Sequence, residues 1–142
     1  MPGRVVGDYM TREVVALLDT DTLRAAVELE LRRKVRHMPV LDAQGVLVGI
    51  VTDRDLKRAL PTPLSPPTPD EHEYILDETH VSKVMTREPY TVGPNTPIVA
   101  AIEQLLDQKI GGLPVVEGGA LVGMFTQSDA LRGFLALLKE TG

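Results

Sequence analysis

Residues 47–55 read LVGIVTDRD and residues 121–129 read LVGMFTQSD, so one nine-residue pattern occurs twice in the chain. Each copy is a short apolar run that contains a glycine and ends in Thr-x-x-Asp. Working outward, the same two motifs precede each copy: Met10-Thr11 and Pro39-Val40 in the first half, Met85-Thr86 and Pro114-Val115 in the second. The order is the same and the shift is 74 or 75 residues. This pattern indicates an internal repeat and therefore two similar structural units.

Each half is predicted to contain a short apolar strand, an amphipathic helix, two strands joined by a tight turn, and a closing helix. The amphipathic helix is predicted from apolar residues on one face: Ile98, Ala101, Ile102, Leu105 and Leu106 in the second half, and Leu23, Ala26, Val27 and Leu31 in the first. The tight turns are predicted at residues 42–45 and at Gly118-Gly119. We therefore expect an α/β (α+β) fold, in which each unit is a small three-stranded sheet with two packing helices.

Composition divides the chain into a domain over residues 1–60, a Pro-rich acidic linker over 61–82, and a second domain over 83–142. The net charges of these segments are +1, −5 and −1, so the acidic excess lies in the predicted linker. Five prolines between Pro61 and Pro69 favour an exposed connection there. Because a unit of about 60 residues buries a marginal core alone, we expect the two domains to pack together about a pseudo-twofold axis.

The composition also excludes several classes of function. The chain has no cysteine, which excludes disulfides, zinc–thiolate sites and thiol nucleophiles. The net charge of −5 argues against a general nucleic-acid binder. We expect no catalysis and no metal site, because the sequence has no Walker loop, no Gly-x-Ser-x-Gly motif and no cluster of metal-ligating residues. No apolar run approaches the roughly 20 residues that cross a bilayer, and we expect a cytoplasmic protein.

The Thr-x-x-Asp motif has two interpretations, which apply to Thr52 with Asp55 and to Thr126 with Asp129. A threonine at a helix N-cap followed three residues later by an acidic residue is typical of a capping box. Alternatively, the carboxylate accepts hydrogen bonds from the two adjacent hydroxyls of a ribose, while the threonine hydroxyl and the helix N-terminus bind a phosphate. The two roles are compatible, because a carboxylate at the start of a helix is favourable.

On these motifs the chain resembles the cystathionine-β-synthase-type (CBS) domain family, whose members occur as tandem pairs called Bateman modules. Three motifs carry the resemblance in each half: Met-Thr, x-Pro-Val, and Leu-Val-Gly followed by two apolar residues and Thr-x-x-Asp. Within the family, the run KIGGLPVVE at residues 109–117 is similar to stand-alone proteins of the acetoin-utilisation type. The resemblance implies a regulatory module with an adenosine ligand in a cleft between the two domains, and a homodimer shaped as a disc of two pairs.

The resemblance also implies two composite ligand sites. One would combine Thr52, Asp55 and His37 with Thr86, Tyr90 and Ile110, and the other would combine Thr126, Asp129 and Gly112 with Thr11, Val15 and Val35. Arg36 and Arg54 are candidates for binding a phosphate beside Asp55, whereas dipole complementation at a helix end is the alternative for Arg32 and Arg33. For the apolar members the alternative is core packing, and Gly111-Gly112 either admits a base or forms a turn.

The function expected from these features is sensing of AMP, ADP or ATP, with S-adenosylmethionine ranked behind them, and signalling to a partner protein; no cofactor is required. The alternative is a ligand-free scaffold that dimerises or docks on an enzyme or transporter. Nucleic-acid binding by the cations of residues 32–36 is a third hypothesis. The apolar face of residues 130–139 is the predicted dimer interface.

Overall fold

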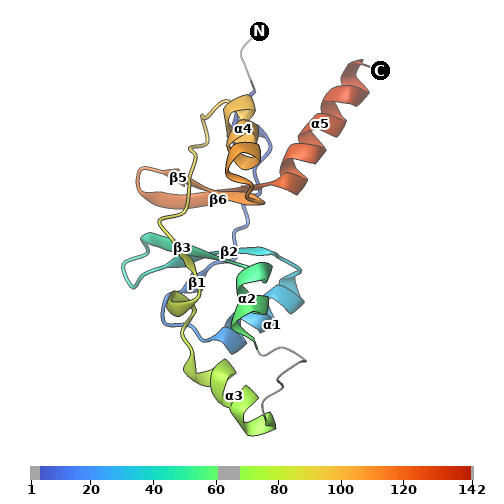
Figure 1. The fold of residues 1–142 in the computed structure, drawn as a ribbon. Helices are drawn as coiled ribbons and strands as arrows, with labels where there is room; N and C mark the ends of the chain where they lie inside the picture. Colours follow the sequence, from blue (N-terminus) through green and yellow to red (C-terminus); the bar gives the residue numbers. More distant parts are fainter. Residues whose placement is uncertain (1–3, 61–67, 142) are drawn as a thin grey trace. The chain divides into compact units, whose positions relative to one another are not determined.

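In the computed structural model, which describes residues 4–60 and 68–141, the chain forms two compact units of mixed helices and strands (Figure 1). We call them unit 1, which takes the chain up to Val14 and from Tyr90 onward, and unit 2, which takes Val15–Pro89. The predicted α+β class is confirmed, but the named sheets have four strands in unit 2 and two in unit 1 instead of the predicted three, and unit 2 has a third α-helix. The units differ from the segments predicted from composition, because each unit includes the Met-Thr motif of the other repeat.

Unit 2 is built around one four-stranded sheet. Its strands lie in the order β1 (Leu17–Leu18), β2 (His37–Leu41), β3 (Leu47–Thr52) and β4 (Thr86–Arg87). The β1 strand runs parallel to β2, and the other two pairs are antiparallel. The β2–β3 turn is the predicted one, where Gly45 has a φ of +82° and its amide donates to the carbonyl oxygen of Asp42. The fourth strand, β4, comes from the second repeat.

The helices of unit 2 close its core. They are α1 (Leu23–Arg33), α2 (Asp53–Ala59), α3 (Pro69–Glu78) and the short 3-10 turn η2 (Val81–Lys83). The buried core gathers side chains from all of these elements and from the sheet: Leu17, Leu23, Ala26, Met38, Val40, Val51, Leu56, Leu76 and Val81. Unit 2 therefore draws core residues from both sides of the Pro-rich segment.

Unit 1 has the second repeat at its centre and a two-stranded sheet of β5 and β6. Its elements are η1 (Val6–Asp8), α4 (Ile98–Gln108), β5 (Gly112–Glu117), β6 (Ala120–Thr126) and α5 (Gln127–Thr141). The predicted hairpin turn between β5 and β6 is confirmed, with φ of +58° and +82° at its two glycines. Isolated bridges join Thr11 to Met124 and Val92 to Val115. The buried core consists of Val6, Met10, Val92, Ala101, Leu105, Leu113, Val115 and Phe125.

A glycine in each unit makes room for the Met-Thr motif of the other repeat. A Cβ atom on Gly123 would lie 2.8 Å from the carbonyl oxygen of Thr11 and 2.9 Å from the sulfur of Met10. In unit 2, a Cβ atom on Gly49 would lie 2.9 Å from the carbonyl oxygen of Thr86 and 2.5 Å from the sulfur of Met85. These distances are shorter than Cβ atoms tolerate, so glycine is the residue that fits beside each Met-Thr motif without a shift of its neighbours.

The last apolar residue of each predicted helical stripe does not join the core. Leu31 and Leu106 are 73% and 70% exposed, although Leu23 and Leu105 are buried. Each residue turns about 100° around the helix axis, so the residue at i+8 lies about 80° from residue i. The residue at i+3 lies about 60° from residue i on the opposite side, so position i+8 falls outside the buried face. The two errors fall at equivalent positions of the repeat.

The α5 helix exposes the apolar face of residues 130–139. Its buried residues are Asp129 and Gly133, and a Cβ atom on Gly133 would lie 3.0 Å from the ring of Tyr9. The exposed apolar residues of the helix are Leu131, Phe134, Leu135, Leu137 and Leu138. The helix therefore packs on unit 1 through small and polar residues and leaves its apolar face uncovered by the described part of the chain.

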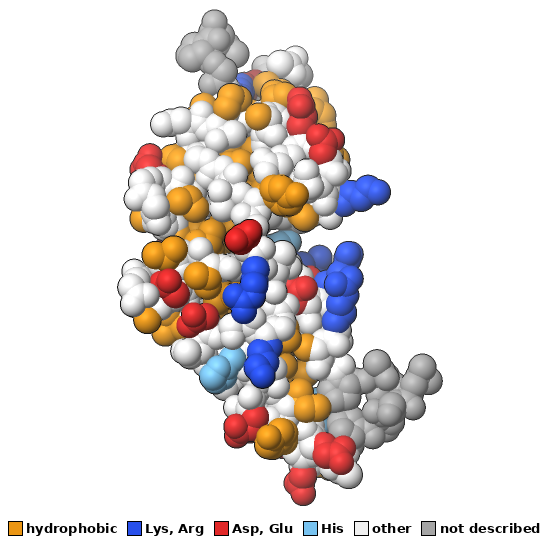
Figure 2. All heavy atoms as spheres, turned by 60° about the vertical axis from the view of Figure 1, so that its left-hand side comes forward, with side chains coloured by type: hydrophobic (Ala, Val, Ile, Leu, Met, Phe, Trp, Pro, Cys, Tyr) orange, Lys and Arg blue, Asp and Glu red, His pale blue; other side chains and the backbone are white. Residues whose placement is uncertain are grey.

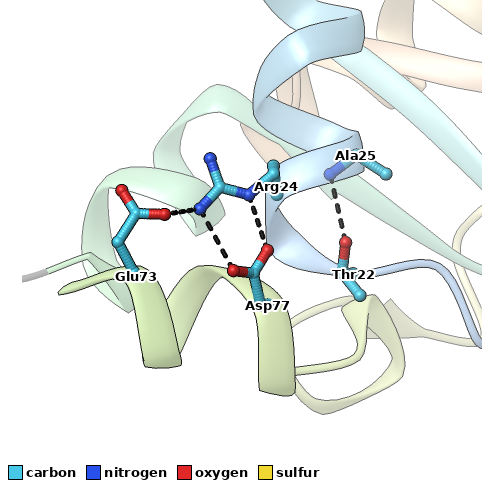
Figure 3. Close-up of polar contacts among 5 residues, drawn as sticks. All are labelled: Thr22, Arg24, Ala25, Glu73 and Asp77. Carbon is cyan, nitrogen blue, oxygen red and sulfur yellow. Dashed lines mark hydrogen bonds and ion pairs between the residues drawn. The ribbon is translucent and has the colours of Figure 1, made fainter. Parts of the chain in front are cut away.

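The acidic part of the predicted linker is a helix and not only an exposed connection. The α3 helix packs on α1, where Arg24 donates to both carboxylate oxygens of Asp77, at 2.6 and 3.3 Å, and to Glu73 (Figure 3). Leu76 lies in the core below. Acidic side chains are visible around α3 in Figure 2. The proline-rich residues 61–67 lie outside the described residues.

Candidate functional site

In unit 2, Thr52 and Asp55 form the predicted capping box at the start of α2. The amide of Thr52 donates to Oδ2 of Asp55 at 2.9 Å, and the amide of Asp55 donates to Oγ1 of Thr52 at 3.2 Å. The capping interpretation is thus confirmed for this box. The Oδ1 atom of the half-buried Asp55 accepts no hydrogen bond from residues 4–60 and 68–141. We call this pair the Asp55 box.

Backbone pairing and chain position place three other predicted residues near the Asp55 box. His37 is paired with Thr52 in the β2–β3 ladder, and the carbonyl oxygen of Arg36 accepts from the amide of Asp53 at 3.1 Å. Arg54 is the second residue of α2, and both Arg36 and Arg54 are exposed. The start of β2 and the start of α2 therefore bring an imidazole and two guanidinium groups to the same end of unit 2.

The local field keeps the His37 imidazole neutral over a wider pH range than usual. Burial lowers the pKa of His37 most, and the charge of Arg36 lowers it further. The carboxylate of Asp53 acts in the opposite direction and raises this pKa, but it does not reverse the shift. Beside the Asp55 box, the positive charge near neutral pH therefore comes from the arginines.

In unit 1, the carboxylate of Asp129 is far more enclosed. Only 1% of this residue is exposed. Its Oδ2 atom accepts from the amide of Thr126 at 2.9 Å and from the hydroxyl of Thr126 at 3.1 Å, and its Oδ1 atom accepts from the hydroxyl of Thr11 at 2.9 Å and from Arg132. The amide of Asp129 donates to Thr126 in return, at 3.4 Å. We call this group the Asp129 box, and the capping interpretation is confirmed here too.

The two boxes differ at equivalent positions of the repeat. Arg132 pairs with Asp129, whereas Arg58, three residues after Asp55, forms no ion pair with the described part of the chain. The hydroxyl of Thr11 reaches Asp129, but that of Thr86 donates to no described residue, although Thr86 is paired with Ile50 in the sheet. One carboxylate is thus saturated with donors and the other is half open.

The remaining predicted site residues are divided between the units. Thr86, Val15 and Val35 lie in unit 2, and Thr11, Tyr90, Ile110 and Gly112 lie in unit 1. Val35 and Ile110 pack against the cores of their own units, which is the core-packing alternative. Tyr90 is exposed and Val15 is half-buried. Gly112 is the first residue of β5, paired with Thr126, so it does not form a turn.

Cations are concentrated in unit 2, as expected from the sequence. Arg32 and Arg33 form the last turn of α1, which is the position that complements the helix dipole. Further exposed cations follow on the chain and on the neighbouring α2: Lys34, Arg36, Arg54, Lys57 and Arg58. Lys and Arg side chains are visible on this unit in Figure 2.

Sequence reasoning missed the role of Arg132. The one feature of the sequence that indicates this ion pair is the spacing of three residues between Asp129 and Arg132, which places both on one face of a helix. Among residues 4–60 and 68–141, no group of three or more His, Cys, Asp or Glu side chains is placed to hold a metal ion. The same residues contain no helix with the length and apolar content needed to cross a bilayer.

Comparison with known proteins supports the internal repeat. A family model described as the CBS domain matches residues 6–62 and 81–136. Over 137 residues, the chain is 36% identical to a CBS domain-containing protein of Dictyostelium discoideum, covering 95% of this chain and 94% of that protein. It is also 30% identical over 128 residues to a homoserine O-acetyltransferase of Methanococcoides burtonii, of which it spans 23%.

Two solved structures share nearly the whole fold. One is a candidate acetoin utilization protein (AcuB) of Vibrio cholerae, with 34% identity, a TM-score of 0.80, and coverage of 97% of this chain and 95% of that chain. The other is Arabidopsis thaliana CBSX2 in complex with AMP, with 30% identity, a TM-score of 0.78, and coverage of 95% and 98%. The first agrees with the resemblance noted at residues 109–117.

Proposed function

Because the chain belongs to the CBS domain family, we propose that it is a non-catalytic regulatory module that binds AMP, ADP or ATP at the Asp55 box. The observation that carries this proposal is the half-open carboxylate of Asp55. One of its oxygens accepts from Thr52 at 2.9 Å, and the other has no donor among the described residues. A ribose has two adjacent hydroxyls, and a carboxylate oxygen with free lone pairs can accept from them.

The charges around the Asp55 box suit the phosphate end of a nucleotide. Arg36 and Arg54 are exposed beside it, and a guanidinium group binds phosphate oxygens with two parallel hydrogen bonds. Because its pKa is lowered, His37 enters as a neutral ring that donates or accepts one hydrogen bond. The complex of AMP with CBSX2, a protein 30% identical to this chain, supports the choice of an adenine nucleotide.

Isothermal titration with AMP, ADP, ATP and S-adenosylmethionine tests this proposal. We expect at least one adenine nucleotide to bind, and we expect Asp55→Ala to weaken that binding at least tenfold. The reason is that hydrogen bonds to a charged group contribute roughly 1.5–3 kcal/mol, and about 1.4 kcal/mol corresponds to a factor of ten. Arg36→Gln should weaken the binding of ATP more than the binding of AMP, because ATP carries more phosphate charge.

Glu71→Ala is the matched control for the loss of a capping box. Glu71 accepts from the amide of Thr68 at 3.2 Å in the same unit, but it belongs to α3 and not to the proposed site. This variant should keep the affinity of the native protein. No heat and no thermal shift with any of the four compounds would contradict the proposal and favour the ligand-free scaffold.

The proposed module acts in the cytoplasm and reports the energy state of the cell to a partner protein. A ligand can do this only by binding one arrangement of the protein more tightly than another. The exposed apolar face of α5 is where we propose that a second copy of the chain docks, and the same face would serve the scaffold alternative. Leu135→Glu should shift the protein from dimer to monomer in sedimentation experiments, and an unchanged mass would contradict this interface.

A further inference from the structure

The residues Arg4–Thr11, which we call the N-terminal segment, contact α5 along its length. Arg4 pairs with Glu140 at 2.6 Å near the end of α5, and the ring of Tyr9 covers Gly133 in the middle. At the start of the helix, the hydroxyl of Thr11 donates to Asp129 at 2.9 Å. The segment thus runs beside α5 from one end to the other.

The backbone of the N-terminal segment is fixed to the rest of unit 1. Thr11 and Met124 exchange two hydrogen bonds, at 2.8 and 2.9 Å, and the amide of Gly7 donates to the carbonyl oxygen of Pro94 at 2.8 Å. The amide of Val6 donates to Thr96 at 2.9 Å. The backbone of the segment is therefore bonded to β6 and to residues 94–96, while its side chains contact α5.

Asp129 is the residue where these parts meet. Its two oxygens accept four hydrogen bonds, from Thr11 of the N-terminal segment, from the amide and hydroxyl of Thr126 at the end of β6, and from Arg132 of α5. A carboxylate has about four acceptor positions, so none is left over. A charge that is only 1% exposed needs such partners, because an unpaired buried charge is costly.

We propose that Asp129 is a lock that fixes the N-terminal segment and α5 to β6, and that the Asp129 box is closed to ligand. The closure of the Asp129 box to ligand rests on the proposed function and deepens it: the chain then has one nucleotide site, the Asp55 box. A ribose at Asp129 would have to displace the donors from Thr11 and Arg132. At Asp55 it would displace none from the described part of the chain.

Amide hydrogen exchange tests the lock without any ligand. Thr11→Val keeps the shape of the side chain and removes the hydroxyl that donates to Asp129. We expect amide exchange at residue 11 and at Met124 to become faster by about tenfold or more, because a hydrogen bond to a buried charge is lost. Thr86→Val is the matched control at the equivalent position of unit 2 and should leave exchange in β3 and β4 unchanged within about twofold.

Equal effects of the two threonine variants, or none at Thr11, would overturn the lock. Asp129→Asn is a second variant that keeps the size of the side chain, and it should accelerate exchange across α5 and the N-terminal segment together. If this variant does not fold, the Thr11→Val comparison decides alone.

Titration with AMP and ATP tests the closed box. The native protein should bind one nucleotide per chain, and Thr11→Val should bind with the same stoichiometry and an affinity within about twofold. Two nucleotides per chain, or loss of binding in Thr11→Val while it stays folded, would overturn the closed box. If the native protein binds no nucleotide, the proposed function fails, and the exchange experiment still accepts or rejects the lock.

Discussion

At the scale of single residues, two glycines make the exchange of Met-Thr motifs between the repeats possible. Gly123→Ala places a methyl group 2.8 Å from the carbonyl oxygen of Thr11, which is too close to be accommodated without backbone movement. We predict a loss of about 1–3 kcal/mol in the free energy of unfolding, measured by urea denaturation. Gly93→Ala is the control, since its nearest neighbour is 3.7 Å away. An equal loss in both variants would show that the close approach at Gly123 has no special cost.

His37 should make stability depend on pH in a predictable direction. Its pKa in the folded protein lies below the ordinary value of 6.5, so as the pH falls the unfolded chain takes up the proton first. The contribution of His37 is therefore complete above about pH 6.5 and is lost as the pH falls toward the lowered value. Urea denaturation at about pH 7.5 and about pH 5.5 should show a smaller decrease in His37→Gln than in the native protein. Identical decreases would contradict the burial of this ring.

The capping of both boxes could be predicted from sequence, because Thr and Asp stand three residues apart and the contact is local. The contact of Thr11 with Asp129 spans 118 positions, so local spacing does not predict it, and only the family resemblance grouped the two residues in one site. Nothing in either motif distinguishes the saturated carboxylate from the half-open one. The difference arises from where Arg132 and Thr11 lie in three dimensions.

At the scale of elements, α3 is held on α1 by Arg24. The two-oxygen contact with Asp77 lowers the pKa of that carboxyl group, and Glu73 adds a second acidic partner. We predict that Arg24→Gln speeds amide exchange in residues 70–78, while Arg33→Gln on the same helix does not, because Arg33 has no acidic partner among the described residues. Both pairs are exposed, so the effect on global stability should be small. Unchanged amide exchange in Arg24→Gln would show that Arg24 does not hold α3 on α1 and that the apolar packing of Leu76 is sufficient.

The sequence analysis did not predict the α3 helix, because the prolines before it favour an exposed connection. Pro69 stands at the start of the helix, where its missing amide costs nothing, and Thr68 with Glu71 forms a capping box. The capping box at Thr68 and Glu71 predicts that the acidic stretch is a helix. The composition of the same stretch predicts an exposed connection, and its charge does not distinguish the two predictions.

At the scale of the whole molecule, the repeat is evident from sequence, but the exchange of segments between the repeats is not. The same periodicity would result if each Met-Thr motif stayed with its own repeat. The core of unit 2 includes Leu76 and Val81, which lie beyond the first repeat. We therefore predict that a fragment of residues 15–89 shows a cooperative thermal transition by circular dichroism and that a fragment of residues 1–60 does not. A cooperative transition in the shorter fragment would favour the boundaries predicted from composition.

We propose that an adenine nucleotide binds at the Asp55 box and not at the Asp129 box. The most direct measurement is an amide NMR titration of the isotope-labelled full chain with AMP and ATP, which follows both boxes in one experiment. We predict saturable shifts at Thr52–Asp55 and at His37, with small changes at Thr126–Asp129. Saturable shifts centred on Thr126–Asp129, or none at either box, would contradict the account.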